Sequence, residues 1–220
     1  IELLKALNYE VKTVKNKESG RAFLSKGLLD EAKTLANENV AIYKDLISEN
    51  NVLIGIEPSA ILTFTDEYIK LADDKISAKK IAKHAYLIDE FIADEIKLGN
   101  INSSQFTKEE KSIKFHGHCH QKALRNQSSS FEMLNLPTNY KVTIIPSGCC
   151  GMAGSFGYEK EHFEISMKIG EQTLFPAINR TKEQVIIAAN GTSCRHQIMD
   201  GTRKKALHPV SILHKALLDL

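Results

Sequence analysis

The sequence predicts an α/β fold made of two related subdomains, each with a parallel sheet and helices on its faces. Short apolar runs typical of strands alternate along the chain with longer stretches that have helical spacing, which favours parallel sheets. The order of these segments also recurs in the two halves of the 220 residues. We therefore expect residues 1–100 and 101–220 to form two subdomains related by an approximate twofold axis.

The first half contains two short apolar runs and two helical patterns. Residues 11–14 are predicted as a strand, residues 28–48 as a helix, and residues 52–56 as a buried strand that ends at Glu57-Pro58. A long amphipathic helix is predicted for residues 77–98, with Ser77 as its N-cap. The polar residues 99–111 are predicted to be a linker.

The second half repeats this order. Strands are predicted for residues 113–115, 142–145 and 185–189, and helices from residue 121, over residues 159–175 and over residues 209–220. His208, which precedes the last of these helices, is expected to cap it or pack against it.

Spacings match when the halves are overlaid. Val11 precedes Gly20 by nine residues, as Val142 precedes Gly151, and "IGIEPSA" aligns with "AANGTSC". An aspartate follows each of these two motifs at the same distance. Chance could align any two α/β segments, but three matched landmarks favour a diverged duplication. By this overlay the first copy has no cysteine, and we expect its opening strand to lie upstream of residue 1.

All four cysteines belong to the second half, and each follows a predicted strand: Cys119, Cys149, Cys150 and Cys194. The carboxyl ends of parallel strands meet at one sheet edge, so we expect the four thiols to converge there. Four thiolates suffice for tetrahedral zinc or for an iron–sulfur cluster with four cysteine ligands. Cysteines that pack independently as small apolar residues are the plain alternative, and their placement on loops argues against it. Glycines on both sides of the cysteine pair let the backbone approach a bulky inorganic group.

The histidines of "HGHCH" lie at alternate positions, a spacing that places three rings on one face of a strand, as in some zinc enzymes. However, Cys119 would then face the other way and Gly117 would weaken the strand. We therefore expect each histidine to have an ordinary packing or capping role. His118 and His196 are the candidates for auxiliary ligands or hydrogen-bond donors near the metal. The glycine-rich segment matches no phosphate-binding pattern.

Composition excludes some function classes. The net charge of +2, with lysines and acids interspersed, gives no basis for nucleic-acid binding. The sequence contains no apolar run that would form a transmembrane segment, and no signal peptide. We expect the protein in a reducing compartment, in the cytoplasm or peripherally at the inner face of the membrane.

Four segments carry a family resemblance: "HGHCHQKAL", "SGCCGMAGSFGYE", "NGTSCRHQI" and "HPVSIL". In this order they resemble the cysteine-rich CCG domain at the carboxyl end of FAD-linked oxidases of the glycolate oxidase and D-lactate dehydrogenase type. "SGRAFLSKGLLDEAK" and "IEPSAILTFTDEY" resemble the first CCG repeat of the same proteins. The resemblance implies two CCG-type repeats, a degenerate one over residues 1–100 and a second one over residues 101–220 that holds the cysteine site.

The resemblance also implies a function. In that family an upstream FAD domain oxidises a 2-hydroxy acid such as glycolate, D-lactate or D-2-hydroxyglutarate. Ferredoxin-like clusters and the CCG region then pass the electrons to an acceptor. The family's cluster ligands correspond to Cys119, Cys149, Cys150 and Cys194, whereas the fullest family pattern has a fifth thiol where this chain has Gly191. That difference argues against the non-cubane clusters of some relatives.

The leading hypothesis is therefore an iron–sulfur electron-transfer region, with a 4Fe–4S cluster and no dehydrogenase activity of its own. Its partners would be the upstream flavin and ferredoxin-like domains and an electron acceptor. Backbone amides of Gly151, Ala153 and Gly154 would donate hydrogen bonds to the cluster sulfurs and raise the reduction potential. A structural zinc module held by the same cysteines is the alternative, and a zinc hydrolase that uses the histidines is a weaker one.

Overall fold

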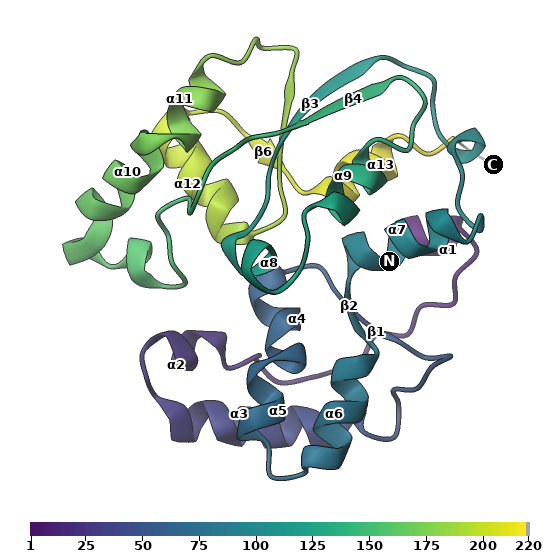
Figure 1. The fold of residues 1–220 in the computed structure, drawn as a ribbon, viewed down its shortest axis with the longest axis vertical. Coiled ribbons are helices and arrows are strands. Elements are labelled where there is room, and N and C mark those ends of the chain that lie inside the picture. The colour runs from purple at the N-terminus through teal and green to yellow at the C-terminus, as the bar shows by residue number, and fades with distance from the viewer. Residues whose placement is uncertain (219–220) are drawn as a thin grey trace. The chain divides into compact units, whose positions relative to one another are not determined.

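The structure is a computed structural model that describes residues 1–218. The chain divides into two compact units, Thr13–Ile88 and a larger unit that combines Ile1–Lys12 with Asp89–Leu220 (Figure 1). This division into compact units does not test whether residues 1–100 and 101–220 are two copies of one repeat, so the two-repeat organisation stays a prediction. The predicted α/β class is confirmed, because both sheets are parallel and helices connect their strands.

The smaller unit has a two-stranded parallel sheet, β1 (Leu53–Gly55) and β2 (Ala85–Leu87), and five helices. The helices are α2 (Arg21–Ser25), α3 (Leu29–Tyr43), α4 (Pro58–Thr65), α5 (Glu67–Leu71) and α6 (Lys75–Lys83). Pro58 begins α4, where a missing N–H costs nothing. The side chain of Asp74 caps α6 by accepting a hydrogen bond from the backbone N–H of Ser77.

The expected strand at residues 11–14 is wrong. That segment has no regular structure, and a buried asparagine of α3 binds the chain that follows it. Asn39 accepts a hydrogen bond from the backbone N–H of Lys17 and donates one to the carbonyl of Glu18, at 3.0 and 2.9 Å. Side-chain hydrogen bonds of this kind satisfy backbone groups without a sheet partner.

The expected long helix over residues 77–98 is also wrong. The chain forms α6, then β2, then α7 (Ile88–Lys97). The residues of β2 are alternately buried and half-buried, and they pair with β1 from Leu53↔Ala85 to Gly55↔Leu87. Sheet pairing therefore overrides the helical spacing of the apolar residues, which continues through this stretch.

The larger unit has a four-stranded parallel sheet in the order β4-β3-β5-β6. Its strands are β3 (Lys111–His116), β4 (Tyr140–Ile144), β5 (Ile186–Ala189) and β6 (Ala206–Leu207). The three predicted strands of the second half correspond to β3, β4 and β5. Because β3 lies between β4 and β5, the loops that leave these three strands are neighbours.

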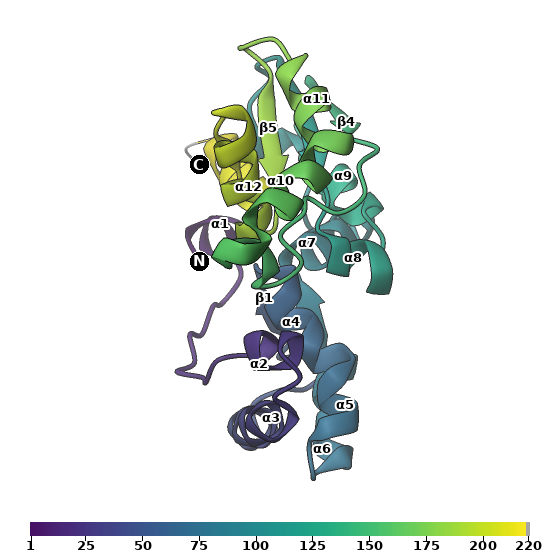
Figure 2. The same cartoon turned by 90° about the vertical axis from the view of Figure 1, so that its left-hand side faces the viewer.

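Helices cover both faces of this sheet. In Figure 1, α10 (Phe163–Gln172), α11 (Leu174–Asn179) and α12 (Thr192–Thr202) lie to its left, and they face the viewer in Figure 2. On the other side lie α9 (Ser128–Leu134), α13 (Pro209–Lys215), α7 and α1 (Glu2–Ala6). A short helix, α8 (Cys119–Leu124), follows β3. Three 3-10 turns, at Ser103–Gln105, Phe156–Tyr158 and Lys160–His162, complete the unit.

Two predicted helices are shorter than expected. The segment at residues 159–175 begins with a 3-10 turn, continues as α10 and ends in α11, because the chain breaks at Thr173. The last helix ends at Lys215, and residues 219–220 of the expected helix lie outside the described residues. His208 caps this helix as expected, since its Nδ1 accepts a hydrogen bond from the N–H of Val210 at 3.1 Å. Within residues 1–218 no helix is both long and apolar enough to span a bilayer.

Candidate metal centre

The candidate site lies at the carboxyl edge of the four-stranded sheet, within the larger unit. β3 ends at His116, and α8 begins three residues later at Cys119. Cys149 and Cys150 lie on the loop that follows β4. Cys194 lies in the first turn of α12, after β5. Two helix N-termini and one loop, all distant in sequence, therefore supply the four thiols, so the expectation that all four cysteines lie on loops is wrong for Cys119 and Cys194.

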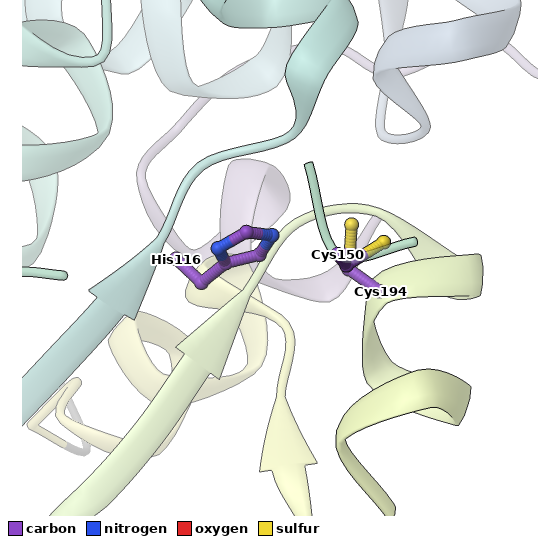
Figure 3. A group of neighbouring side chains, drawn as sticks. All are labelled: His116, Cys150 and Cys194. Carbon is purple, nitrogen blue, oxygen red and sulfur yellow. The ribbon is translucent and has the colours of Figure 1, made fainter. Parts of the chain in front are cut away.

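Three of the site residues form a tight buried group: His116, Cys150 and Cys194 (Figure 3). One ring nitrogen and the two sulfurs all lie within 4.8 Å of one another. The side chains have exposed fractions of 0%, 2% and 1%, so water has almost no access to them. The sequence patterns assigned His116 an ordinary role, and the signal that could have linked it to the site is its place directly after a predicted strand, three residues before Cys119.

Cys119 and Cys149 are half-buried, and their thiols interact with each other. This interaction, followed by burial, raises the pKa of Cys119. The pKa of Cys149 lies well below its ordinary value, first because of Cys119 and then because of the neighbouring Cys150. Cys149 therefore connects the half-buried pair to the buried group.

The two buried cysteines form a second pair. The interaction with Cys149, and then with Cys194, raises the pKa of Cys150. The pKa of Cys194 is lowered by Cys150 against the effect of burial, and the rings of His116 and His118 lower it further. Two neighbouring cysteine sulfurs with imidazole rings nearby are a donor set that suits a soft or borderline metal ion.

The turn after the cysteine pair positions Cys149. The backbone N–H of Gly151 donates a hydrogen bond to Cys149 Sγ at 3.3 Å, and the backbone of Ala153 also lowers the pKa of Cys149. Gly151, Ala153 and Gly154 have φ angles of 107°, 40° and 73°, so the turn is left-handed. The expected amide contacts to a cluster stay a prediction for these residues.

Lys122 contacts the two loop residues that precede the cysteine pair. Lys122 Nζ donates hydrogen bonds to the carbonyls of Ser147 and Gly148 at 2.6 and 2.8 Å. Burial lowers the pKa of Lys122, and the nearby cysteine thiols act in the opposite direction. The ammonium group therefore lies within electrostatic range of all four thiols.

The two expected auxiliary histidines lie in different environments. His118 Nδ1 accepts a hydrogen bond from the N–H of His120 at 3.1 Å, which caps α8, and its ring contacts Gly191 where a Cβ would stand. His196 is exposed, and its Nδ1 is hydrogen-bonded to the hydroxyl of Tyr158 at 2.8 Å. An auxiliary role of either histidine stays a prediction.

A buried polar network lies behind the loops. Asn190 accepts a hydrogen bond from the N–H of His118 at 3.1 Å, and its amide donates to Gln121 Oε1 at 2.7 Å and to Asp89 Oδ2 at 3.4 Å. The hydroxyl of Ser130 also donates a hydrogen bond to Asp89 Oδ2. Desolvation raises the pKa of Asp89 despite these bonds. Asn190 thus links the loop before α8 to the loop before α12, the helix that carries Cys194.

The site geometry fits a soft metal ion. Around a tetrahedral zinc ion, with bonds of about 2.0–2.3 Å, the ligand atoms lie roughly 3.5–3.8 Å apart. The buried group would have to contract by about 1 Å to reach that arrangement. The four thiols together also supply the number of thiolates that a cluster with four cysteine ligands requires.

Comparisons with known proteins identify relatives that are longer than this chain. The chain is 25% identical over 220 residues to one subunit of the anaerobic glycerol-3-phosphate dehydrogenase of Escherichia coli (strain K12), a match that covers 99% of the chain and 54% of that protein. It is 24% identical over 214 residues to the D-2-hydroxyglutarate dehydrogenase of Pseudomonas putida, and 26% identical over 216 residues to that of Escherichia coli (strain K12). Each of these two matches covers 97% of the chain and 20% of the relative.

No model of a known protein family matches the chain, and no solved structure matches it. The chain spans about half the length of the glycerol-3-phosphate dehydrogenase subunit and a fifth of the D-2-hydroxyglutarate dehydrogenases. Over nearly its whole length, the chain is therefore similar to one part of two kinds of larger dehydrogenase.

Proposed function

We propose that this chain is an electron-transfer region of a larger dehydrogenase and that it binds an iron–sulfur cluster through Cys119, Cys149, Cys150 and Cys194. The observation that supports the proposal is that the four cysteines follow three adjacent parallel strands and that their thiols shift one another's pKa. Similarity to parts of two kinds of dehydrogenase supports a redox role over a purely structural one. When bound, a cluster of this kind accepts and releases single electrons.

The protein groups around the thiols have defined roles in this proposal. The backbone amide of Gly151 stabilises negative charge on Cys149. The ammonium group of Lys122 offsets part of the charge that the thiolates bring into the site. Both groups would favour the reduced, more negative state of the centre. Burial of Cys150 and Cys194 excludes water and acts in the opposite direction, because a dry site disfavours added charge.

The resemblance and the relatives give the proposal a context. The 2-hydroxy acid would be oxidised at a flavin in another domain of the same protein, and this chain would conduct the electrons toward an acceptor. The chain by itself would then reduce no dye with glycolate, D-lactate or D-2-hydroxyglutarate. A dye-reduction assay with these three acids tests this point, and turnover by the chain alone would contradict it.

A structural zinc site is the second candidate. The observation in its favour is the size of the buried group, because three ligand atoms within 4.8 Å suit one ion. In a cubane cluster, by contrast, each thiolate binds a different iron, so its ligands are spread more widely.

Anaerobic purification, followed by metal and sulfide analysis and an absorption spectrum, separates the two candidates. We expect iron, acid-labile sulfide and a visible absorption band that bleaches on reduction. A variant with all four cysteines changed to serine is the control, and it should be colourless. A colourless wild-type protein with one zinc ion per chain would favour the structural site instead. A protein with neither metal, even after incubation with iron and sulfide or with zinc, would refute both.

A further inference from the structure

We infer that His116 Nε2 binds the metal directly, beside Cys150 and Cys194, so that the centre has a mixed nitrogen–sulfur ligand set. The inference rests on the proposed metal-binding function, and it places a nitrogen ligand beside Cys150 and Cys194. In a cubane cluster, whose four irons each take one protein ligand, His116 would take the place of one of the four cysteines.

The first argument is the position of the residue. His116 is the last residue of β3, the strand that pairs with both β4 and β5. It lies opposite Ala189 in the parallel register with β5. The loop after β4 carries Cys150, and the first turn of the helix after β5 carries Cys194. The sheet therefore holds the imidazole between the two segments that supply the buried sulfurs, with one ring nitrogen toward them (Figure 3).

The second argument is an unsatisfied nitrogen. His116 Nε2 is fully buried, and its polar neighbour is the thiol of Cys194, with which it makes a contact that falls short of ordinary hydrogen-bond geometry but lowers the pKa of that thiol. A buried polar atom without a partner costs about 1–3 kcal/mol, so most such atoms in native proteins have a partner. A metal ion held by the two nearby sulfurs would supply that partner.

The third argument is the tautomer of the ring. His116 Nδ1 lies 2.7 Å from Ser147 Oγ, whose hydroxyl is directed to the carbonyl of Ile145 at 3.5 Å. If that hydroxyl donates to the carbonyl, it accepts from the ring, and the proton of the imidazole is on Nδ1. The lone pair of Nε2 is then free for a metal ion. Metal-binding histidines characteristically donate their other N–H to an acceptor in this way.

The neighbouring histidines differ in this respect. His118 uses Nδ1 to cap α8, and His196 is exposed and bonded to Tyr158. An ordinary packing role for His116 would account for its burial, but it would leave Nε2 without a hydrogen bond of ordinary geometry next to two sulfurs.

The test is a nitrogen hyperfine measurement on the protein grown with ¹⁵N-histidine. One sample is loaded with Co²⁺ and another with iron and sulfide, and pulsed EPR measures the ¹⁵N coupling to each paramagnetic centre. We expect a strong coupling in the wild-type protein that His116→Ala abolishes.

His116→Ala should weaken Co²⁺ binding at least about tenfold, because outer-shell substitutions alone cost 10–100-fold. Added imidazole should restore both binding and a nitrogen coupling. His214→Ala, which changes an exposed histidine of α13, is the matched control and should leave both unchanged.

The outcomes separate this inference from the proposed function. A wild-type protein that binds neither cobalt nor iron refutes the metal-binding proposal, and this inference with it. A protein that binds metal without a strong histidine ¹⁵N coupling refutes the inference alone. The wild-type measurement needs no variant, so the test holds even if His116→Ala fails to fold.

Discussion

The left-handed turn after the cysteine pair allows a paired substitution test. Gly151→Ala places a Cβ where the backbone has a φ of 107°, a conformation that costs an L-residue about 1–2 kcal/mol. The added carbon would overlap the carbonyl of Ser166 and lie 2.8 Å from Gln197 Nε2. Gly148→Ala is the matched control on the other side of the cysteines, because nothing lies within 4 Å of its Cβ and its φ is not positive.

The expected cost of Gly151→Ala has two parts. Besides the φ strain, the variant disturbs two buried hydrogen bonds of Gln197 Nε2, to Ser166 O and to Ser166 Oγ, both at 2.9 Å. Each such bond contributes about 1 kcal/mol, so the unfolding free energy should fall by about 2–4 kcal/mol in total. Gly148→Ala should change it by less than about 1 kcal/mol.

Urea unfolding of the two variants measures this difference, and metal content per chain measures its effect on the site. We expect Gly151→Ala to bind less metal, since the turn that positions Cys149 and Cys150 must shift. Gly148→Ala should bind as much metal as the wild type. Equal unfolding free energies for the two variants would refute the reasoning, because they would show that the turn does not require its glycine.

Three further predictions concern groups around the site. Asp89→Asn should remove a pH dependence of stability. Because burial raises the pKa of Asp89, the stability it contributes is complete below about pH 4 and is lost as the pH rises through the folded-state pKa. Urea unfolding from pH 4 to 8 should therefore show the wild type losing stability relative to the variant, and a constant difference would contradict this. Ser147→Ala, which removes the partner of His116 Nδ1, should raise the dissociation constant for Co²⁺ about 10–100-fold, and unchanged binding would count against that role. Lys122→Met, compared with Lys122→Arg, should lower the reduction potential of the loaded centre, because a positive charge near the thiols favours the reduced state. Voltammetry measures the potential, and a rise in the methionine variant would contradict the prediction.

The sequence by itself determined the α/β class, the parallel strands of the second half and the position of the four cysteines after those strands. These features depend on local patterns, because short β-rich apolar runs are bounded by turn residues and the cysteines follow such runs. Cap residues are equally local, and His208 was predicted from its place before Pro209.

Only the tertiary structure decided the remaining features. Residues 85–87 continue a helical spacing, and they become a strand because Leu53–Gly55 offers them a parallel partner. Residues 11–14 have a strand-like composition, but no strand among the described residues pairs with them. The proposed role of His116 depends on its closeness to Cys150 and Cys194 and on the hydrogen bond between its Nδ1 and Ser147 Oγ. All of these partners are more than 30 residues away in the sequence. Periodicity records which residues are apolar, whereas strand pairing and the neighbours of a buried ring depend on segments that meet only after folding.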